Sequence, residues 1–561
     1  MTLTGPVREL AEGIARNWLI DLRRTNPAIL DMFHDRDLQP YRDLLPWSGE
    51  FAGKYLTGAF YLDQLIDSAP LREAVADFID ELLGCIDETG YVGCYPRQDR
   101  LTGKFHPAPG VEQHTWDAWN HYHILYGLYL WYLQGGDAQL LEAMERVAGL
   151  LMRTFYQGGA RLIDLGSTET NLAPIHIFAL LYRLTGKAAY LDFARAVEQD
   201  LSAPGAGDYI AWAQAGRDFY TCPQPRWEGL HVIMGLAELY RATGLAKYRQ
   251  TVLQVFSSIL STDVHNTGAF STDEHATGEP FTNGNIELCC AIAYNALAVE
   301  ALLIGEDPAV ADFLEISLYN AVMGSFSPTG RWSTYNTPME GAKRANYQDI
   351  VFQSRPGSPE LNCCSANAAR GVGELSRWAV TEREGTVFLN YYGAATYHLP
   401  GDLLIQVRGD YPAENAVRIR IHAPKLRRVA LRIPAWSART WLSGGAEASP
   451  RPGGYHLIEA ADIELTLQLD FTPHVYHGQG ACAGKVSLYV GPVLYGYDLA
   501  LNPQGDFDHL PVLTPESIAD LTPRRAPDGR ILLRLPDAVL GDFCRLGATG
   551  SVYKTWFPWR P

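Results

Sequence analysis

Leu181-Tyr-Arg-Leu-Thr-Gly186 is the stretch that decides the fold, because a near copy, Leu239-Tyr-Arg-Ala-Thr-Gly244, follows it. Each ends an apolar run of helical period, and its closing glycine is the residue that a left-handed helix C-cap favours. Similar breaks end at Gly136 and Gly305, so the successive glycines lie 50, 58 and 61 residues apart. This spacing fits one helical hairpin plus a loop and indicates a repeat architecture. The long, aromatic-rich loops favour a closed α/α toroid with a pocket at one end over an open solenoid.

After about residue 384 the apolar period changes from that of a helix to two. Runs such as Leu403-Leu-Ile-Gln-Val407, Val417-Arg-Ile-Arg-Ile421, Val429-Ala-Leu-Arg-Ile433 and Ile463-Glu-Leu-Thr-Leu-Gln-Leu469 alternate between apolar and polar residues. They predict antiparallel strands with one buried face, arranged as a β-sandwich. Since 561 residues exceed one ordinary core, we expect a multidomain α and β protein. Residues 1–383 would form the toroid, and residues 384–561 one or two β-sandwich modules.

Composition excludes several classes of function. The net charge is −17 and the chain has no basic run, which argues against nucleic acid and anionic membrane surfaces as partners. No stretch is expected to provide the roughly 18 apolar residues of a membrane span. The first 24 residues lack the pattern of a signal peptide and predict an amphipathic helix. The 13 Trp and 30 Tyr residues suit stacking on sugars, although most aromatic residues belong to cores.

The cysteine pattern bears on the cellular compartment. The chain has nine cysteines, an odd number, and five of them are scattered. This is not a disulfide framework, and a reduced, cytoplasmic setting fits it best. We expect a small glycoside or oligosaccharide as the partner molecule and leave a homodimer open.

The other four cysteines form two clusters, Glu287-Leu-Cys289-Cys290 and Cys363-Cys364. A carboxylate, a cysteine two residues on and a separate cysteine pair make up a four-ligand set that Zn²⁺ prefers. Cys363 and Cys364 can share one ion only in a turn or at a helix start, because adjacent residues of a strand point apart. Two simpler readings compete, namely buried thiols that act as small apolar groups and a disulfide between the adjacent pair.

A loop upstream of these clusters carries two glutamates, Glu274 and Glu279, among glycines and hydroxyl residues. A glycosidase needs a carboxylic acid beside the leaving oxygen. Either glutamate is a candidate for this acid. The competing reading is that both are solvated loop carboxylates.

Polar and aromatic residues also gather where other helices are expected to begin. Trp227-Glu-Gly-Leu-His231, Trp332-Ser-Thr-Tyr-Asn336 and Glu169-Thr-Asn171 are such insertions. A further cluster of polar and aromatic residues runs from His114 to His123. In it we expect His123 to bind substrate hydroxyls and His121 to be a buried, hydrogen-bonded core residue. Each signal is weak alone, but all of them fall at loop positions of the repeat.

On these residues the chain resembles the glycoside hydrolase family 127-type, β-L-arabinofuranosidase-like proteins. The resemblance begins at Gly49-Glu-Phe-Ala-Gly-Lys-Tyr-Leu56 and covers nearly the whole length. It is most specific at Ile286-Glu-Leu-Cys289 and Asn362-Cys-Cys-Ser-Ala-Asn367, and it extends to Leu431-Arg-Ile-Pro-Ala-Trp436 and Gly491-Pro-Val-Leu-Tyr495.

The resemblance implies an (α/α)6 barrel followed by β-sandwich modules, and a retaining glycosidase with one Zn²⁺. The implied zinc ligands are Glu287, Cys289, Cys363 and Cys364. Cys363 is the implied nucleophile, which forms a thioglycosyl intermediate, and a glutamic acid is the acid/base. The implied substrates are small, furanosidic, β-L-arabinofuranoside-like glycosides.

Some residues depart from the family pattern. The family's acid/base glutamate follows a glycine about 15 residues before the Glu-x-Cys motif. Glu274 stands 13 residues before Glu287 but follows an aspartate, whereas Glu279 follows a glycine but stands only 8 residues before it. We prefer Glu274. Leu288 replaces a hydroxyl residue often found there, which weakens the inference of arabinose specificity more than that of the metal. The residues expected around the sugar are His123, His231, Tyr335 and Asn171.

Two alternatives remain open at this point. One is a hydrolase or lyase on the same toroid that acts on uronic or deoxy sugars without cysteine catalysis. The other is a sugar-binding protein without activity, in which the zinc is structural. Activity of a Cys363→Ser variant separates the main reading from the second alternative.

Overall fold

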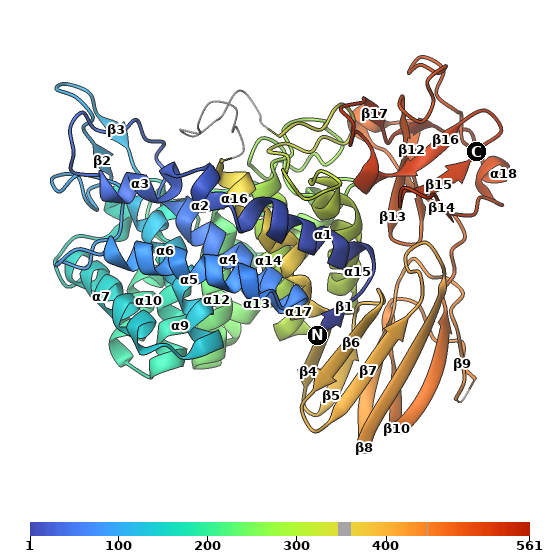
Figure 1. The fold of residues 1–561 in the computed structure, drawn as a ribbon, viewed down its shortest axis with the longest axis horizontal. Coiled ribbons are helices and arrows are strands. Elements are labelled where there is room, and N and C mark those ends of the chain that lie inside the picture. The colour runs from blue at the N-terminus through green and yellow to red at the C-terminus, as the bar shows by residue number, and fades with distance from the viewer. Residues whose placement is uncertain (346–360, 446) are drawn as a thin grey trace.

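The computed structural model describes residues 1–345, 361–445 and 447–561, with a helical region followed by two β regions (Figure 1). Within these residues six helices form an inner ring, in which each packs on the next and the last packs on the first. They are α4 (Glu50–Ile66), α6 (Asp117–Gly135), α9 (Pro174–Thr185), α12 (Gly229–Thr243), α14 (Leu288–Gly305) and α16 (Cys363–Gly373). The closed ring agrees with the predicted toroid.

Outer helices cover the ring. Five of those described each follow an inner helix and pack against it. They are α5 (Ala69–Gly84), α7 (Ala138–Thr154), α10 (Ala188–Asp200), α13 (Ala246–Thr262) and α15 (Pro308–Ser317). The sixth outer position is taken by α1 (Pro6–Ile14), which packs on α4 and α16. The π-helical turn η1 (Ala15–Leu19) continues α1. The N-terminal amphipathic helix therefore closes an (α/α)6 arrangement.

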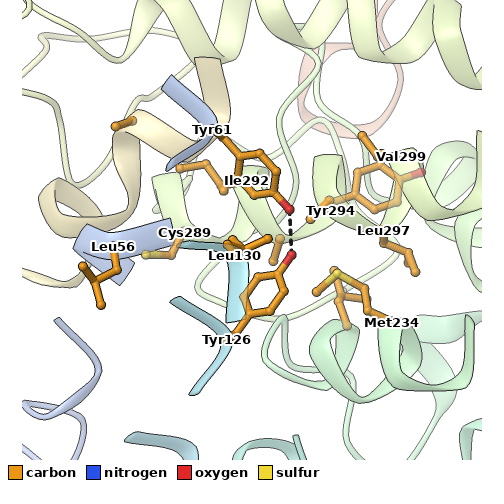
Figure 2. Close-up of a cluster of buried hydrophobic side chains, with 14 of the residues drawn as sticks. Leu56, Tyr61, Tyr126, Leu130, Met234, Cys289, Ile292, Tyr294, Leu297 and Val299 are labelled. Carbon is orange, nitrogen blue, oxygen red and sulfur yellow. Dashed lines mark hydrogen bonds between the residues drawn. The ribbon is translucent and has the colours of Figure 1, made fainter. Parts of the chain in front are cut away.

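Burial explains why the inner and outer helices differ in sequence. In α14, all but two of its residues are buried, whereas α7 buries only one face. A helix that is apolar all round belongs in a core, and an amphipathic one belongs at the surface. In Figure 2, apolar side chains from α4, α6, α12 and α14 meet inside the ring, and the hydroxyls of Tyr61 and Tyr126 form a hydrogen bond of 2.8 Å there.

The helix ends test the glycine prediction directly. Gly136, Gly186 and Gly244 are C-caps with φ of 67°, 70° and 71°, as expected. The prediction is wrong for Gly305, which is the last residue of α14. Its neighbour Glu306 adopts the left-handed conformation, with φ of 60°. The chain continued its helix by one more residue before turning.

The inner helix α14 also corrects the expectation about apolar length. It has 18 residues with a mean hydropathy of 1.9, so by length and composition alone it is long and apolar enough to cross a membrane. In the structure 89% of it is buried inside the protein, where α12, α13, α15 and α16 surround it. A buried core helix passes the same test as a membrane span, so α14 is only weak evidence that the chain crosses a membrane.

The first β region is an eight-stranded sheet among the described residues, with the central order β1-β6-β7-β8-β10-β9. Its strands are β1 (Thr2–Leu3), β4 (Val380–Arg383), β5 (Thr386–Leu389), β6 (Ala395–Leu399), β7 (Leu403–Arg408), β8 (Ala416–Ile433), β9 (Trp441–Ser443) and β10 (Gly454–Gln468). Two of the expected strands, starting at Val417 and Val429, are one strand, β8. The sheet is also not wholly antiparallel, because β5 pairs parallel with β8.

The second β region is another eight-stranded sheet in the described chain, packed around its own apolar core. It comprises β11 (His474–His477), β12 (Lys485–Val490), β13 (Val493–Asp498), β14 (Arg524–Arg525), β15 (Ile531–Arg534), β16 (Val539–Asp542), β17 (Tyr553–Lys554) and β18 (Phe557–Pro558). Figure 1 shows it beside the end of the ring where α16 begins, on the right of the view.

Short elements connect these parts. They are α2 (Leu22–Thr25), α3 (Ala28–His34), α8 (Thr168–Asn171), α11 (Tyr209–Gln214), α17 (Leu375–Trp378), α18 (Pro515–Ile518), the hairpin of β2 (Lys104–Phe105) and β3 (Gln113–His114), the π-helical η4 (Leu318–Val322), and the 3-10 turns η2 (Leu162–Leu165), η3 (Phe219–Thr221), η5 (Gly480–Cys482) and η6 (Phe543–Arg545). The helices give way to strands between Trp378 and Val380, and β1 joins the first sheet by pairing with β6. The division into domains at 383/384 stays a prediction.

Candidate active site

The candidate site lies where the inner helices begin. The cavity there is lined by residues at the starts of α4, α12, α14 and α16, including Glu50, Glu228, Glu287 and Cys363. Helix N-termini carry unpaired N–H groups and the positive end of the helix dipole. This end of the ring therefore favours anions such as thiolates and carboxylates.

The four residues expected to bind zinc come together here. Glu287 is the N-cap of α14, Cys289 lies in its first turn, and Cys363 and Cys364 are the first residues of α16. One ligand atom from each lies within 4.8 Å of all the others. From Oε1 of Glu287 it is 3.3 Å to Sγ of Cys364 and 3.6 Å to Sγ of Cys363. Because the adjacent cysteines stand at a helix start, both reach the same point.

This cluster suits a cation on chemical grounds. Burial, with the charge of Cys289 next, raises the pKa of Glu287 well above its ordinary value. A hydrogen bond to Cys289 likewise raises the pKa of Cys363, and burial raises that of Cys364. Four such groups cannot all ionise at this distance without a positive charge between them. Three thiols and one carboxyl whose ligand atoms lie this close together are a donor set that fits Zn²⁺. The buried cluster can thus hold a metal ion.

The three thiols differ in their surroundings. Cys289 lies 3.7 Å from both the Lys54 ammonium and the Asn367 amide nitrogen. Although burial opposes ionisation, hydrogen bonds from the two other thiols and the charge of Lys54 keep the pKa of Cys289 well below its ordinary value. Lys54 is itself buried and pairs with Glu50 at 2.7 Å. Cys363, in contrast, lines the cavity and is 5% exposed, so it is the sulfur that a ligand can reach.

The cavity itself is narrow, with a volume of about 80 Å³. Its lining combines indole rings, carboxyl groups, one phenol, one guanidinium and one thiol. The lining residues are Trp47, Glu50, Trp116, Arg226, Trp227, Glu228, Glu274, Glu287, Tyr335 and Cys363. Aromatic faces with a few convergent polar groups are typical of a small-molecule site.

Of the two candidate acids, Glu274 lines this cavity. It sits in a tight turn in which His275 N–H donates to the Thr272 carbonyl, and Asp273 and Glu274 both have positive φ, 48° and 66°. Non-glycine residues in this region are strained and cluster at functional sites. The turn brings the Glu274 carboxylate onto Arg226. Glu279 is exposed and is not among the cavity-lining residues of the described chain.

The residues expected around the sugar divide into two groups. Tyr335 lines the cavity, and its carbonyl accepts a hydrogen bond from Leu288 N–H next to Glu287. His123 and His231 are buried, with ring centroids 4.4 and 4.9 Å from that of Trp119. Neither is among the described residues that line the cavity.

The histidines nevertheless contact residues near the site. The ring of His231 lies 5.9 Å from that of Trp227, which does line the cavity, and its Nδ1 lies 2.8 Å from the Tyr122 hydroxyl. Asn171 is buried in α8, where its amide donates a hydrogen bond to the Gly166 carbonyl at 2.9 Å. Among the described residues, Asn171 is not one of those that line the cavity. The structure therefore brings Tyr335 to the cavity, but not Asn171.

Sequence reasoning assigned no role to several residues of the site. Arg226 and Glu228 flank Trp227 just before α12, and both line the cavity. Glu50, which also lines it, and its buried partner Lys54 lie four residues apart in a largely apolar helix. Charged residues are almost never fully buried unless they are paired. The available signal for Glu50 and Lys54 was a Glu-x-x-x-Lys pair within an apolar run. No comparable pattern marked Arg226, whose partner Glu274 is 48 residues away.

Several buried polar atoms at the cavity have no hydrogen-bond partner within the described residues. These atoms are Nε1 of Trp47 and Trp227, Nε of Arg226 and Oε2 of Glu228. Buried polar atoms are rarely left unpaired in native proteins. A polyhydroxylated ligand offers donors and acceptors together and can satisfy this mixed set.

Comparisons with known proteins identify the family of this chain. The model of the family described as "Beta-L-arabinofuranosidase, GH127 catalytic domain" matches residues 27–377. A curated relative from Bifidobacterium longum subsp. longum, "Non-reducing end beta-L-arabinofuranosidase", is 24% identical over 420 residues, which is 66% of this chain and 63% of the relative. The chain thus spans less than two thirds of that relative's length.

Solved structures share the fold. A GH127 β-L-arabinofuranosidase from Geobacillus stearothermophilus T6 superposes with a TM-score of 0.78 at 16% identity, covering 100% of this chain and 99% of the other. Another GH127 β-arabinofuranosidase gives a TM-score of 0.77 at 18% identity, covering 100% and 96%. Since the family model matches more than half of the sequence, the chain belongs to the GH127 family of glycoside hydrolases.

Proposed function

We propose that this protein is a zinc-dependent, retaining glycosidase that cleaves small β-L-arabinofuranoside-like glycosides, with Cys363 as nucleophile and Glu274 as acid/base. The observation that carries the proposal is that Cys363 and Glu274 line the same narrow cavity beside a buried set of zinc-type ligands. The printed activity of the Bifidobacterium relative supports the choice of sugar.

In the proposed mechanism a zinc ion held by Glu287, Cys289, Cys363 and Cys364 would keep the Cys363 sulfur ionised and oriented at neutral pH. The Cys363 sulfur attacks the anomeric carbon, so that a C–S bond forms as the glycosidic C–O bond breaks. Glu274 gives its proton to the departing oxygen. It then takes a proton from water, which attacks the same carbon and releases the sulfur. Two displacements at one carbon leave the configuration unchanged.

The differing environments of the sulfurs support Cys363 as the nucleophile. Cys289 is stabilised as an anion by Lys54 and Asn367, which lowers its reactivity, and Cys364 is fully buried. A structural zinc site is closed, whereas a catalytic one presents a reactive position to the substrate. Cys363 is the sulfur of this cluster that lines the cavity.

The nine cysteines support the cellular setting that we propose, the cytoplasm. All nine are free thiols in the structure, and eight of them are buried. Free thiols and a thiol-rich metal site persist best in a reducing compartment. The proposed partner is a glycoside or oligosaccharide, and a homodimer remains an untested expectation.

The test is product stereochemistry together with labelling of the nucleophile. A screen of chromogenic furanosides and pyranosides identifies the sugar, and NMR of the first-formed product gives its anomeric configuration. Retention, with a mechanism-based sugar electrophile attached to Cys363 in peptide mass analysis, is the expected result. Inversion, or an adduct on a glutamate, would leave the zinc as a structural clip and move the chemistry to the carboxyl groups.

A second candidate is a sugar-binding protein with a structural zinc. Its distinguishing result is stoichiometric sugar binding without turnover of any glycoside in the screen. The strained turn that carries Glu274 into the cavity favours the enzyme, since binding alone does not require a strained acid at this place.

A further inference from the structure

Three carboxyl groups surround one guanidinium at the cavity. Nη2 of Arg226 contacts the Glu274 carboxylate and lies 3.0 Å from Oε1 of Glu228. Nη1 of Arg226 lies 4.0 Å from Oε1 of Glu169. Three negative charges would face a single positive one in a largely buried place. Like charges this close disfavour each other, so one carboxyl group is expected to hold a proton.

Glu228 is the carboxyl group with the strongest reason to be neutral. Glu228 is 1% exposed, whereas the Glu274 side chain is 35% exposed and keeps contact with water. Burial, only partly offset by Arg226, raises the pKa of Glu228 to about 8, and the charges of Glu274 and Glu169 add to the rise. The amide dipoles at the start of α12 favour the anion but do not outweigh burial.

Other charged or titratable groups act on this part of the site. The Tyr209 hydroxyl and the Glu287 carboxyl both feel the charge of Glu228. Each would gain a negative neighbour if Glu228 ionised. Among the charged groups of the described chain that face Glu228, Arg226 supplies the compensating positive charge. Arg226 already pairs with the Glu274 carboxylate.

The geometry also places the proton. Oε1 of Glu228 faces Arg226, which can only donate, so this oxygen is the acceptor. Oε2 is buried and has no partner among the described residues, and Glu228 lines the cavity. A proton on Oε2 turns this orphan atom into a hydrogen-bond donor for a ligand in the cavity.

We infer that Glu228 is a substrate-binding residue that works as a neutral carboxylic acid, donating a hydrogen bond from Oε2 to a hydroxyl oxygen of the bound sugar. The inference rests on the proposed function for the identity of the ligand, a pentofuranosyl group. The inference gives different roles to Glu228 and Glu274, the two carboxyl groups beside Arg226. In the resting site Arg226 pairs with the Glu274 carboxylate and leaves Glu228 uncharged, so Glu274 acts as the acid only after it has taken up a proton.

The first test needs no substrate. Infrared difference spectra of the zinc-loaded wild type against Glu228→Gln should show the carbonyl band of a protonated carboxylic acid at pH 6, which disappears by pH 9.5. Glu142→Gln, which changes an exposed glutamate of α7, is the matched control. The difference spectrum of the wild type against Glu142→Gln should contain no such band. Absence of the band in the wild type overturns the inference whatever the enzyme hydrolyses.

The second test measures binding of L-arabinose by calorimetry to the zinc-loaded protein. Wild-type affinity should fall at least tenfold between pH 6 and pH 9.5. Affinity of Glu228→Gln should not change over that range, because the amide keeps a donor at the position of Oε2–H and an acceptor toward Arg226. Glu228→Ala should bind at least tenfold more weakly than the wild type at pH 6.

The outcomes separate the inference from the proposed function. If Glu228→Gln binds as weakly as Glu228→Ala at pH 6, the ionised form is the binding form and the inference is wrong. If Glu228→Gln instead loses turnover of poor leaving groups but binds normally, Glu228 is the acid itself, which also overturns it. If the infrared band is present but no protein binds L-arabinose, the proposed sugar is at fault and the neutral acid stands.

Discussion

The two ends of the helical ring differ in how their buried charges are balanced. At the end where the inner helices terminate, a cavity of about 650 Å³ is lined by residues that include Glu238, Arg241, Glu300 and Arg377. Here each carboxylate meets two arginines. Glu300 lies 2.5 Å from Arg241 and 2.7 Å from Arg377, and Glu238 pairs with Arg241 and Arg183.

Charge balance, not size, separates the two ends. Burial opposes ionisation of Glu300, but Arg241 and Arg377 outweigh it and hold its pKa well below the ordinary value. At the helix starts the opposite holds, since the pKa values of Glu50, Glu228 and Glu287 are all raised, by burial above all. In the larger cavity the carboxylates are paired with arginines, whereas the carboxyl groups of the smaller one have the raised pKa values that mark a candidate functional site.

The sharpest way to break this comparison is to remove the sulfur that lines the smaller cavity, that of Cys363. Cys363→Ser should lower kcat/KM at least about 10³-fold, because a serine hydroxyl is not ionised at neutral pH and is the poorer nucleophile. Zinc content is measured beside activity, so that loss of metal is separated from loss of the nucleophile. Cys222→Ser, at a buried cysteine outside the cluster, is the control. Activity above one tenth of wild type would rule out a nucleophilic role.

The next effect concerns the acid at the strained turn. Glu274→Gln should lower turnover of glycosides with poor leaving groups by about 10²- to 10⁴-fold and spare the first step with activated aryl glycosides. Glu279→Gln should stay within about threefold of wild type, because Glu279 lies on the exposed part of the loop. Leaving-group dependence of kcat/KM is the measurement. The reverse pattern between the two variants would make Glu279 the acid.

A smaller effect is expected from the cation beside the sulfurs. Lys54→Met should weaken zinc binding about 10- to 100-fold, since it removes the charge 3.7 Å from Cys289, and changes of this kind around metal ligands have that size. Competition with a chromogenic chelator measures the affinity. Lys343→Met, at a buried lysine that donates to the Phe543 carbonyl instead, should leave zinc affinity unchanged. Equal affinities for wild type and Lys54→Met would contradict the role.

The smallest effect belongs to the opposite end of the ring. Tyr61→Phe removes the hydroxyl that bonds to Tyr126, shown in Figure 2, and should cost about 1 kcal/mol of stability. The thermal midpoint should fall by roughly 1–2 °C, and kcat/KM should stay within about twofold. A tenfold loss of activity at unchanged stability would show that the two ends are coupled.

Much of the fold was predictable because its signals are local. Glycine-ended apolar runs gave three of four helix caps, and the change of period near residue 384 lies within a few residues of the change from helix to strand. Closure of the ring by α1 was not predictable, since its partner α16 lies some 350 residues away. The strand β8 was split in two because Pro424 interrupts its alternating pattern, although the strand continues through it.

The candidate site was predictable only in part, for a similar reason. Glu287, Cys289, Cys363 and Cys364 stood out because thiols are rare in the chain and adjacent pairs rarer. Placing His123 at the sugar was less secure, because α6 is buried almost all round and its sequence does not tell which face meets the cavity. Patterning can assign a side only to a helix that has one polar face.

The position of α1 has a consequence for how the protein is made. Its docking surface on α16 leaves the ribosome only after some 350 further residues have been added. At about 5–20 residues per second this wait lasts roughly 20–70 s. Throughout that interval α1 has only α4 of its two final partners, and the ring stays open. A nascent chain of this kind is therefore expected to need shielding by chaperones until α16 emerges, and synthesis speed becomes a determinant of its yield.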